Sequence, residues 1–196
     1  ITNSQIFIDR TRDVGVITKD LALAYGVTGS SLRASGIEWD LRRKCPYDVY
    51  NKMDFQIPIG SRGDCYDRYL VKINEMRKSA KIIEQCIKLI PDGDFISADK
   101  RYCPPQDMKH GDIMFHVKHY QNGFNVPRGT AYVATESPKG EFGIFLVSDG
   151  SNKPSRCHIR STGFPLMTLI KKIVNKVADL PVVLASLDIV LGEVDR

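Results

Sequence analysis

The sequence predicts a mainly α-helical chain with a small antiparallel β-sheet, an α+β fold. Apolar residues recur at three- and four-residue steps from Tyr66 to Ile90, as in a long amphipathic helix. Three β-like runs separated by turn sequences follow between residues 130 and 160. Helical spacing returns after residue 163, so we expect a single domain over residues 1–196 in which helices dominate.

Composition excludes several classes of protein. The chain has 196 residues, with 28 Lys or Arg against 23 Asp or Glu, and a formal net charge of +5. No apolar stretch reaches the roughly eighteen residues that predict a transmembrane helix. No basic stripe or known module indicates nucleic-acid binding. The five cysteines include no C-x-x-C pair, so we expect reduced thiols rather than a disulfide framework.

Residues 1–60 are rich in turn formers and predict ordered loops around one short helix. Thr18 is a suitable N-cap for a helix from Lys19 to Tyr25, and Gly26 stands where a helix-ending glycine belongs. Residues 30–58, which include the only tryptophan, are expected to form a long ordered loop.

Residues 61–90 predict the long core helix, with Ser61 as its cap. Its apolar stripe is formed by Tyr66, Leu70, Ile73, Met76, Ala80, Ile83, Ile87 and Ile90. A helix of this length needs packing partners along most of it. The charges of the string at 62–69 are expected to pair with one another and to hold the helix start.

The second half predicts a short helix at 112–120 and then the sheet. Its strands are expected at 130–135, 142–147 and 156–160. Residues 163–196 predict a helix followed by a buried tail, because the charged end directly follows the apolar run 182–191.

Few residues suggest chemistry by themselves. His116 and His119 lie three apart on a predicted helix, but no third ligand stands at a useful spacing, so surface or capping roles are favoured over a metal site. Lys139 lies in a predicted turn between Glu136 and Glu141, which forms a charged hairpin. Motifs of independent hydrolases, kinases and nucleotide-binding enzymes are absent from the sequence.

Several strings, in this order, resemble one family. They are GIEWDLR at 36–42, PYDVY at 46–50, RGDCYDRY at 62–69, PKGEFG at 138–143, VSDG at 147–150 and GEVDR at 192–196. In them the chain resembles the carboxy-terminal half of the quinone-pocket (NuoD-type, forty-nine-kilodalton) subunit of respiratory complex I, NADH:ubiquinone oxidoreductase. The resemblance implies part of an enzyme that transfers electrons from NADH to ubiquinone and couples this to proton translocation. It also implies that the chain is inactive alone.

This family is similar in fold to the large subunit of nickel–iron hydrogenases, so half of a hydrogenase-like helical fold is implied. Hydrogenases end in a D-P-C-x-x-C-x-x-H segment, which falls on residues 188–196 here. Val190 and Glu193 stand at the cysteine positions and Arg196 at the histidine position, so we expect no metal. The resemblance implies instead a quinone-pocket wall made of Val190, Glu193, Asp195 and Arg196, with charged support from Lys139, Glu141 and Arg62. It assigns no catalytic residue to this half.

The resemblance also implies cofactors and partners outside the chain. No cofactor is expected on this chain alone; ubiquinone would bind at a shared site, and a neighbouring subunit would hold a [4Fe-4S] cluster. The expected partners are a separate chain with the amino-terminal half of the subunit, the iron–sulfur subunit of the terminal cluster, other peripheral-arm subunits and the membrane-arm quinone-channel subunit.

Such a split subunit favours the matrix side of the mitochondrial inner membrane over a bacterial cytoplasmic membrane. Two alternatives stay open: a hydrogenase-like subunit of another membrane-bound ion-translocating complex, and a purely structural assembly subunit.

Overall fold

A computed structural model describes residues 2–95 and 110–195, leaving aside the side chains of residues 110–112, 115, 191 and 195. The chain forms two compact units. Residues 1–88, 134–143 and 159–196 make the first, and residues 89–133 and 144–158 make the second. No helix in the described ranges is both long and apolar enough to cross a membrane.

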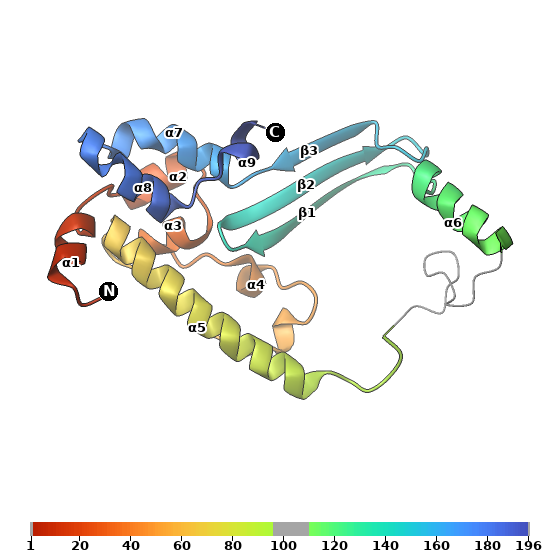
Figure 1. Cartoon of the computed structure of the whole chain (residues 1–196), viewed down its shortest axis with the longest axis horizontal. Helices are drawn as coiled ribbons and strands as arrows, with labels where there is room; N and C mark the ends of the chain where they lie inside the picture. The colour runs from red at the N-terminus through yellow and green to blue at the C-terminus, as the bar shows by residue number, and fades with distance from the viewer. Residues whose placement is uncertain (1, 96–109, 196) are drawn as a thin grey trace. The chain divides into compact units, whose positions relative to one another are not determined.

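The first unit begins with four short α-helices and a 3₁₀ turn (Figure 1). They are α1 (Gln5–Thr11), α2 (Lys19–Ala24), α3 (Gly29–Ala34), α4 (Leu41–Lys44) and η1 (Tyr50–Lys52). The predicted start of α2 is confirmed, because the Leu21 amide donates to the Thr18 hydroxyl at 3.3 Å. Gly26 follows the helix with φ +64°, as the sequence predicted. The prediction of a loop over 30–58 was wrong, because α3, α4 and η1 form within it.

The long helix α5 runs from Cys65 to Leu89, so it begins four residues later than predicted. Asp64 caps it instead of Ser61: Asp64 Oδ1 accepts from the Asp67 amide at 2.7 Å. Asp64 Oδ2 also accepts from the Asp13 amide at 3.0 Å, which ties the helix start to the segment after α1. The expected ion-pair network at 62–69 is therefore replaced by carboxylates that bind backbone amides.

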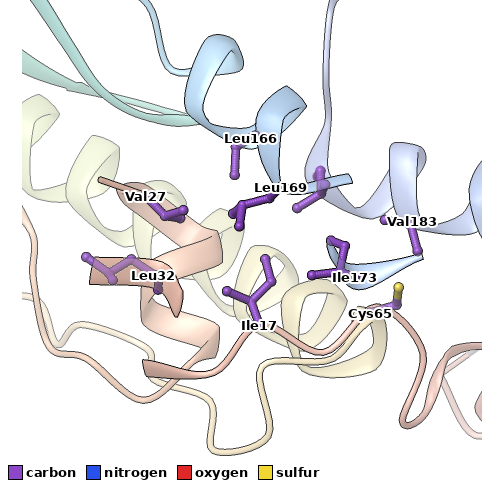
Figure 2. Packing of buried hydrophobic residues seen from close by; sticks show 10 residues of the cluster. Ile17, Val27, Leu32, Cys65, Leu166, Leu169, Ile173 and Val183 are labelled. Atoms are coloured by element: carbon purple, nitrogen blue, oxygen red, sulfur yellow. The ribbon is translucent and has the colours of Figure 1, made fainter. Parts of the chain in front are cut away.

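The buried face of α5 differs from the apolar stripe that the sequence suggested. Its buried residues are Cys65, Arg68, Val71 and Ile82. The main core of the first unit lies between α2, α3, α7 and α8, and α5 contributes Cys65 to it (Figure 2). The remaining buried apolar members of this cluster are Ile17, Ala22, Val27, Leu32, Leu166, Leu169, Ile173, Val183 and Leu187. A second cluster packs Met53 and Phe55 against Ile82 of α5.

The predicted small antiparallel sheet is confirmed, with strand order β1-β2-β3 (Figure 1). The strands are β1 (Gly129–Ser137), β2 (Gly140–Ser148) and β3 (Arg156–Arg160). The first two are longer than predicted, and the third has the predicted bounds. In the second unit α6 (His110–Asn122) precedes the sheet and is also longer than predicted. There Arg128 Nε donates to the Asp149 carbonyl at 2.7 Å and fixes the loop after β2.

Residues 163–195 form more helices than the single one that the sequence predicted. They are α7 (Gly163–Ile173), the 3₁₀ turn η2 (Val177–Asp179), α8 (Leu180–Leu187) and α9 (Leu191–Asp195). Asp188 ends α8 in the left-handed conformation, with φ +58°. This residue and Ile189 turn the chain from α8 toward the short last helix.

Candidate functional site

The turn between β1 and β2 contacts the start of α3 at two glycines, Gly140 and Gly29. A Cβ atom on Gly29 would lie 2.4 Å from Gly140 Cα, so the two backbones touch without room for a side chain. Gly29 has φ +73°, a conformation that favours glycine. The Glu141 amide donates to the Thr28 hydroxyl at 3.0 Å. This contact brings the Pro138–Gly143 string beside residues more than a hundred positions earlier.

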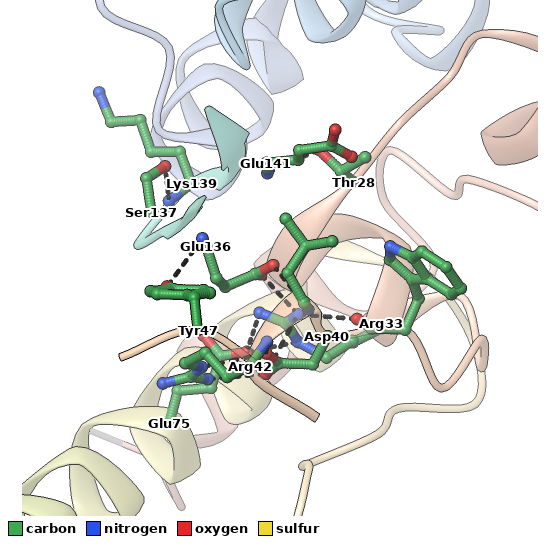
Figure 3. Close-up of polar contacts among 12 residues, drawn as sticks. Thr28, Arg33, Asp40, Arg42, Tyr47, Glu75, Glu136, Ser137, Lys139 and Glu141 are labelled. Atoms are coloured by element: carbon green, nitrogen blue, oxygen red, sulfur yellow. Dashed lines mark hydrogen bonds and ion pairs between the residues drawn. The ribbon is translucent and has the colours of Figure 1, made fainter. Parts of the chain in front are cut away.

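Arg33 of α3 is at the centre of a buried ion-pair network (Figure 3). Its guanidinium contacts Glu75 of α5 at 2.6 Å and Glu136 of β1 at 2.8 Å. It also donates to the Trp39 carbonyl at 2.9 Å, and the arginine is 1% exposed. Burial alone would lower the pKa of Arg33, but its carboxylate neighbours raise it, so the guanidinium stays charged.

A second guanidinium completes the network. Arg42 donates to both oxygens of Asp40, at 3.0 Å and 2.7 Å, in a bidentate pair. Burial opposes ionisation of Asp40, but the hydrogen bonds and charge of Arg42 lower its pKa below the usual value. Burial raises the pKa of Glu75, which Arg33 only partly offsets. Two guanidinium groups thus face three carboxylates, those of Asp40, Glu75 and Glu136.

A cavity of about 560 Å³ opens beside this network. Its charged floor includes Arg33, Glu75 and Glu136. Its apolar wall includes Met76 and Ile83 of α5 and Pro138 of the β1–β2 turn. At the same cavity Lys72 Nζ lies 3.7 Å from Asp188 Oδ2. A cavity with one apolar wall and one ionic wall suits an amphipathic occupant.

Glu193 of the tail caps α7 from outside that helix. Its Oε1 atom accepts hydrogen bonds from the amides of Thr162 and Gly163 at 2.9 Å and 3.1 Å, and from the Thr162 hydroxyl at 3.0 Å. Partial burial would raise the pKa of Glu193, but these hydrogen bonds and Lys139 lower it below the usual value. A carboxylate at a helix N-terminus is also favoured by the helix dipole.

The structure brings some of the sequence-predicted site residues together. Lys139 Nζ lies 3.8 Å from Glu193 Oε2, so the hairpin turn and the tail meet as expected. Val190 is 49% exposed and the Glu193 side chain is 22% exposed, so these two residues of the tail are only partly buried in this chain. The side chain of Asp195, and Arg196 as a whole, lie outside the described residues.

Other predicted residues have different partners. Arg62 lies at the surface, where Nη1 is 3.6 Å from Asp13 Oδ1. Glu141 takes part through its backbone, which accepts from Arg160 and donates to Thr28. The charges of the predicted hairpin have partners outside it, since Lys139 pairs with Glu193 and Glu136 pairs with Arg33.

Arg68 of α5 has its observed hydrogen-bond partners in α8 and at the start of α5. Arg68 is fully buried and donates to the Gly63 carbonyl at 2.7 Å, to Ser186 Oγ at 3.1 Å and to Cys65 Sγ at 3.1 Å. Burial lowers its pKa from the ordinary value, although nearby groups oppose this. Arg68 thus joins the start of α5 to α8.

Sequence reasoning missed Arg33, Glu75, Thr162 and Gly163. For Arg33 a signal existed, because it is the only charged residue between Asp20 and Glu38. A lone charge inside a segment of small and apolar residues indicates a buried charge that needs partners. His116 and His119 both contact the ring of Tyr120. Within the described residues no three His, Cys, Asp or Glu side chains converge as metal ligands would.

Comparison with known proteins gives one consistent family. Residues 1–196 match the family described as respiratory-chain NADH dehydrogenase, 49 Kd subunit. Three similar proteins are each named as the same subunit of NADH-quinone oxidoreductase. The Rhizorhabdus wittichii protein is 49% identical over 200 residues, which cover 99% of this chain and 49% of that protein. Those of Anaplasma phagocytophilum and Ehrlichia ruminantium are 47% and 46% identical over 202 residues, covering 100% of this chain and 51% of each. The chain thus spans about half the length of these relatives.

Proposed function

The chain belongs to the 49 kDa subunit family of respiratory-chain NADH dehydrogenase, and we propose that it supplies one wall of the quinone site of such an enzyme. In that role it works only inside the assembled complex, where electrons from NADH reach ubiquinone through iron–sulfur clusters held by other subunits. Proton translocation is driven by the same reaction in the membrane arm. The observation that carries the proposal is the anchored tail, residues 188–195.

The geometry of the tail supports a wall of fixed shape. Glu193 is bound to the first amides of α7, and its second oxygen is near Lys139. Three residues earlier, Val190 presents an apolar side chain that this chain leaves 49% exposed. A partly exposed valine three residues before an anchored carboxylate provides apolar contact surface for a ring or for a neighbouring subunit.

Quinone reduction consumes two electrons and two protons, so the site also needs groups that hold or transfer protons. We assign Asp195 a supporting role in protonation, from its position in the tail. Glu193 is a poor proton donor near neutral pH, because its hydrogen bonds favour the ionised form. Glu193 and Arg196 are therefore proposed as structural and electrostatic parts of the wall, with Lys139 as support.

The proposed partners and location follow from the family. The complementary half of the subunit, the iron–sulfur subunit with the terminal [4Fe-4S] cluster, other peripheral-arm subunits and the membrane-arm quinone-channel subunit would surround this chain. We place it in the membrane-associated peripheral arm of the complex, on the matrix side of the mitochondrial inner membrane. The relatives named above come from bacteria, so the cytoplasmic side of a bacterial membrane is the alternative location.

The test uses the assembled enzyme with Val190→Met and Asp195→Asn. Val190→Met enlarges an apolar wall without adding charge, so it should change inhibitor response more than assembly. Val177→Met is the matched control, because Val177 is 86% exposed and lies in η2. Asp195→Asn should lower quinone reduction while electron transfer from NADH to an artificial acceptor persists. Unchanged quinone kinetics and inhibitor response in both variants would make the tail purely structural.

A purely structural role has one observation in its favour, namely that Glu193 is fully engaged as a helix cap. Labelling the assembled enzyme with a photoreactive quinone separates the two roles. We expect label in residues 188–196. Label confined to other chains would support the structural role.

A further inference from the structure

Two basic residues of α5 contact the end of α8. Arg68 Nε donates to Ser186 Oγ at 3.1 Å, in the last turn of α8. One turn further along α5, Lys72 Nζ lies 3.7 Å from Oδ2 of Asp188, the residue that ends α8. Residues four apart lie on the same side of a helix, so α5 meets α8 through two successive turns. Arg68 is fully buried and the Lys72 side chain is 27% exposed, so Lys72 lies nearer the surface, where the chain leaves α8 for the tail.

Asp188 has a backbone conformation that needs support. Its φ of +58° is left-handed, which is strained for residues other than glycine, although Asp tolerates it better than most. The Asp188 amide donates to the Leu184 carbonyl at 3.0 Å, and its carboxylate pairs with Lys72. The direction in which the chain leaves α8 is therefore held by one backbone hydrogen bond and by this ion pair.

The surroundings of Lys72 favour its charged form on two counts. Burial lowers the pKa of Lys72 from its ordinary value, and Asp188 opposes this shift more than any other group does. Among the remaining neighbours Arg68 lowers the pKa and Glu75 raises it. The carboxyl-terminal end of α8 also favours a nearby positive charge, because the last carbonyl groups of a helix carry partial negative charge. Lys72 thus has both a carboxylate and a helix end as electrostatic partners.

The exposed Val190 lies between two anchored residues. Glu193 binds the first amides of α7, and Asp188 pairs with Lys72. We propose that Lys72 is a positioning residue of the quinone-site wall: through Asp188 it sets the direction of residues 188–190 and thereby where Val190 presents its side chain. In this role Lys72 does not itself contact quinone. The inference rests on the proposed function, which assigns Val190 to that wall.

An exposed ion pair on the same helix provides the matched control. Lys88 Nζ lies 2.6 Å from Glu84 Oε1, and the two side chains are 69% and 65% exposed. Lys88 is sixteen residues beyond Lys72, which is about 24 Å along the helix axis at 1.5 Å per residue. Lys88→Gln therefore removes a lysine charge and an ion pair from α5 without acting on the end of α8.

The first experiment uses the reassembled subunit, meaning this chain together with the complementary half of the family sequence. Amide hydrogen exchange of residues 188–193 measures how firmly the tail is held. Lys72→Gln should speed this exchange about three- to fivefold, and Lys88→Gln should change it by less than about twofold. Lys72→Arg keeps the charge and should restore the original rate. Equal exchange in Lys72→Gln and in the unsubstituted subunit would overturn the proposal.

Asp188→Asn tests whether the two residues act as a pair. Asn also tolerates the left-handed backbone, so this substitution removes the charge without adding strain. It should speed exchange as Lys72→Gln does, and the double variant should exchange no faster than either single variant. Additive effects of the two substitutions would contradict the pairing.

The second experiment measures activity in the assembled enzyme. Lys72→Gln should raise the KM for a short-chain ubiquinone and change the half-inhibitory concentration of a quinone-site inhibitor, each by about threefold or more. Electron transfer from NADH to an artificial acceptor and the kcat of quinone reduction should stay within about twofold. Lys72→Arg should rescue both altered values. A merely structural role would lower the amount of assembled enzyme and leave KM unchanged.

The two proposals can fail separately. Unchanged hydrogen exchange overturns the role of Lys72, whatever the quinone kinetics show. If Lys72→Gln speeds exchange but neither it nor Val190→Met changes the inhibitor response, the quinone-site proposal fails instead. If Val190→Met changes the inhibitor response and Lys72→Gln does not, the wall is correctly assigned and Lys72 does not position it.

Discussion

Glu193 Oε1 lies 2.9 Å from the Thr162 amide and 3.0 Å from the Thr162 hydroxyl, across 31 positions of sequence. The carboxylate thereby satisfies amide groups at the start of α7 that the helix itself leaves unpaired. Because Lys139 approaches the other oxygen, the contact joins α7, the tail and the β1–β2 turn. Glu193 thus acts as a cap of α7 that lies 30 residues after the helix start.

Replacing Glu193 with Gln should lower the free energy of unfolding of the reassembled subunit by about 1 kcal/mol, because the charged acceptor at the helix start is lost. The effect depends on pH. The pKa of Glu193 in the folded chain lies below its usual 4.5, so its stabilisation is complete above that pH. Stabilisation is then lost as the pH falls through the folded pKa. Chemical denaturation at several pH values should show this acid-dependent component only with Glu193 present.

Arg33→Met should destabilise the reassembled subunit by about 3–5 kcal/mol, because it leaves Asp40, Glu75 and Glu136 buried without this guanidinium. Arg62→Met is the matched control. Its pair with Asp13 is exposed on both sides, so the change should stay within about 0.5 kcal/mol. Thermal unfolding of the two variants compares these losses of stability. Equal shifts in Tm would show that the Arg33 network contributes little to the stability of the subunit.

Asp64→Ala should cost about 2 kcal/mol, because the amides of Asp13 and Asp67 both lose their acceptor. Asp64→Asn keeps one acceptor oxygen and should recover part of this loss. Asp20→Ala, which removes an acid from the first turn of α2, should cost only a few tenths of a kcal/mol. Denaturant titration of the three variants measures their free energies of unfolding. If Asp64→Ala costs no more than Asp20→Ala, Asp64 does not stabilise the start of α5 as a cap.

Gly29→Ala should destabilise by about 3 kcal/mol or more, since a Cβ would meet the Gly140 backbone at 2.4 Å and the left-handed backbone adds strain. Gly26→Ala separates the two causes. Gly26 has a similar φ of +64° but no atom within 4 Å of the added Cβ, so it should cost only about 1–2 kcal/mol. Comparable losses of unfolding free energy in the two variants would contradict the close contact between the β1–β2 turn and the start of α3.

Local sequence patterns correctly predicted those helices and strands whose formation is determined by neighbouring residues. The third strand, Arg156–Arg160, was predicted residue by residue, and Thr18 was placed correctly as the cap of α2. Spacing also found the long helix, but not its first residue. Asp64 outcompetes Ser61 because its second oxygen binds the distant Asp13 amide, a contact that no local pattern contains.

The candidate site was only partly predictable, since most of its contacts join segments far apart in sequence. Lys139 was named with Glu141 and Arg62 as charged support for the tail, and of these Lys139 lies near Glu193. Thr162 carries no sequence signal of its role, because any helix start could have received Glu193. Arg33 had a signal in its isolation, yet its partners Glu75 and Glu136 come from α5 and β1. Tertiary packing also determines that Met76, Ile83 and Ile87 of α5 are exposed and do not belong to this chain's main core.

The wide sequence separation of these buried contacts sets an order of events during synthesis. Arg33 precedes Glu136 by 103 positions, and Arg68 precedes Ser186 by 118. Until residues 136 and 186 have been synthesised, the two guanidinium groups lack these later partners. Closing such long loops costs entropy before any contact repays it, which slows folding. The first unit can therefore complete its interior only after α7 and α8, which supply much of its core, have been synthesised.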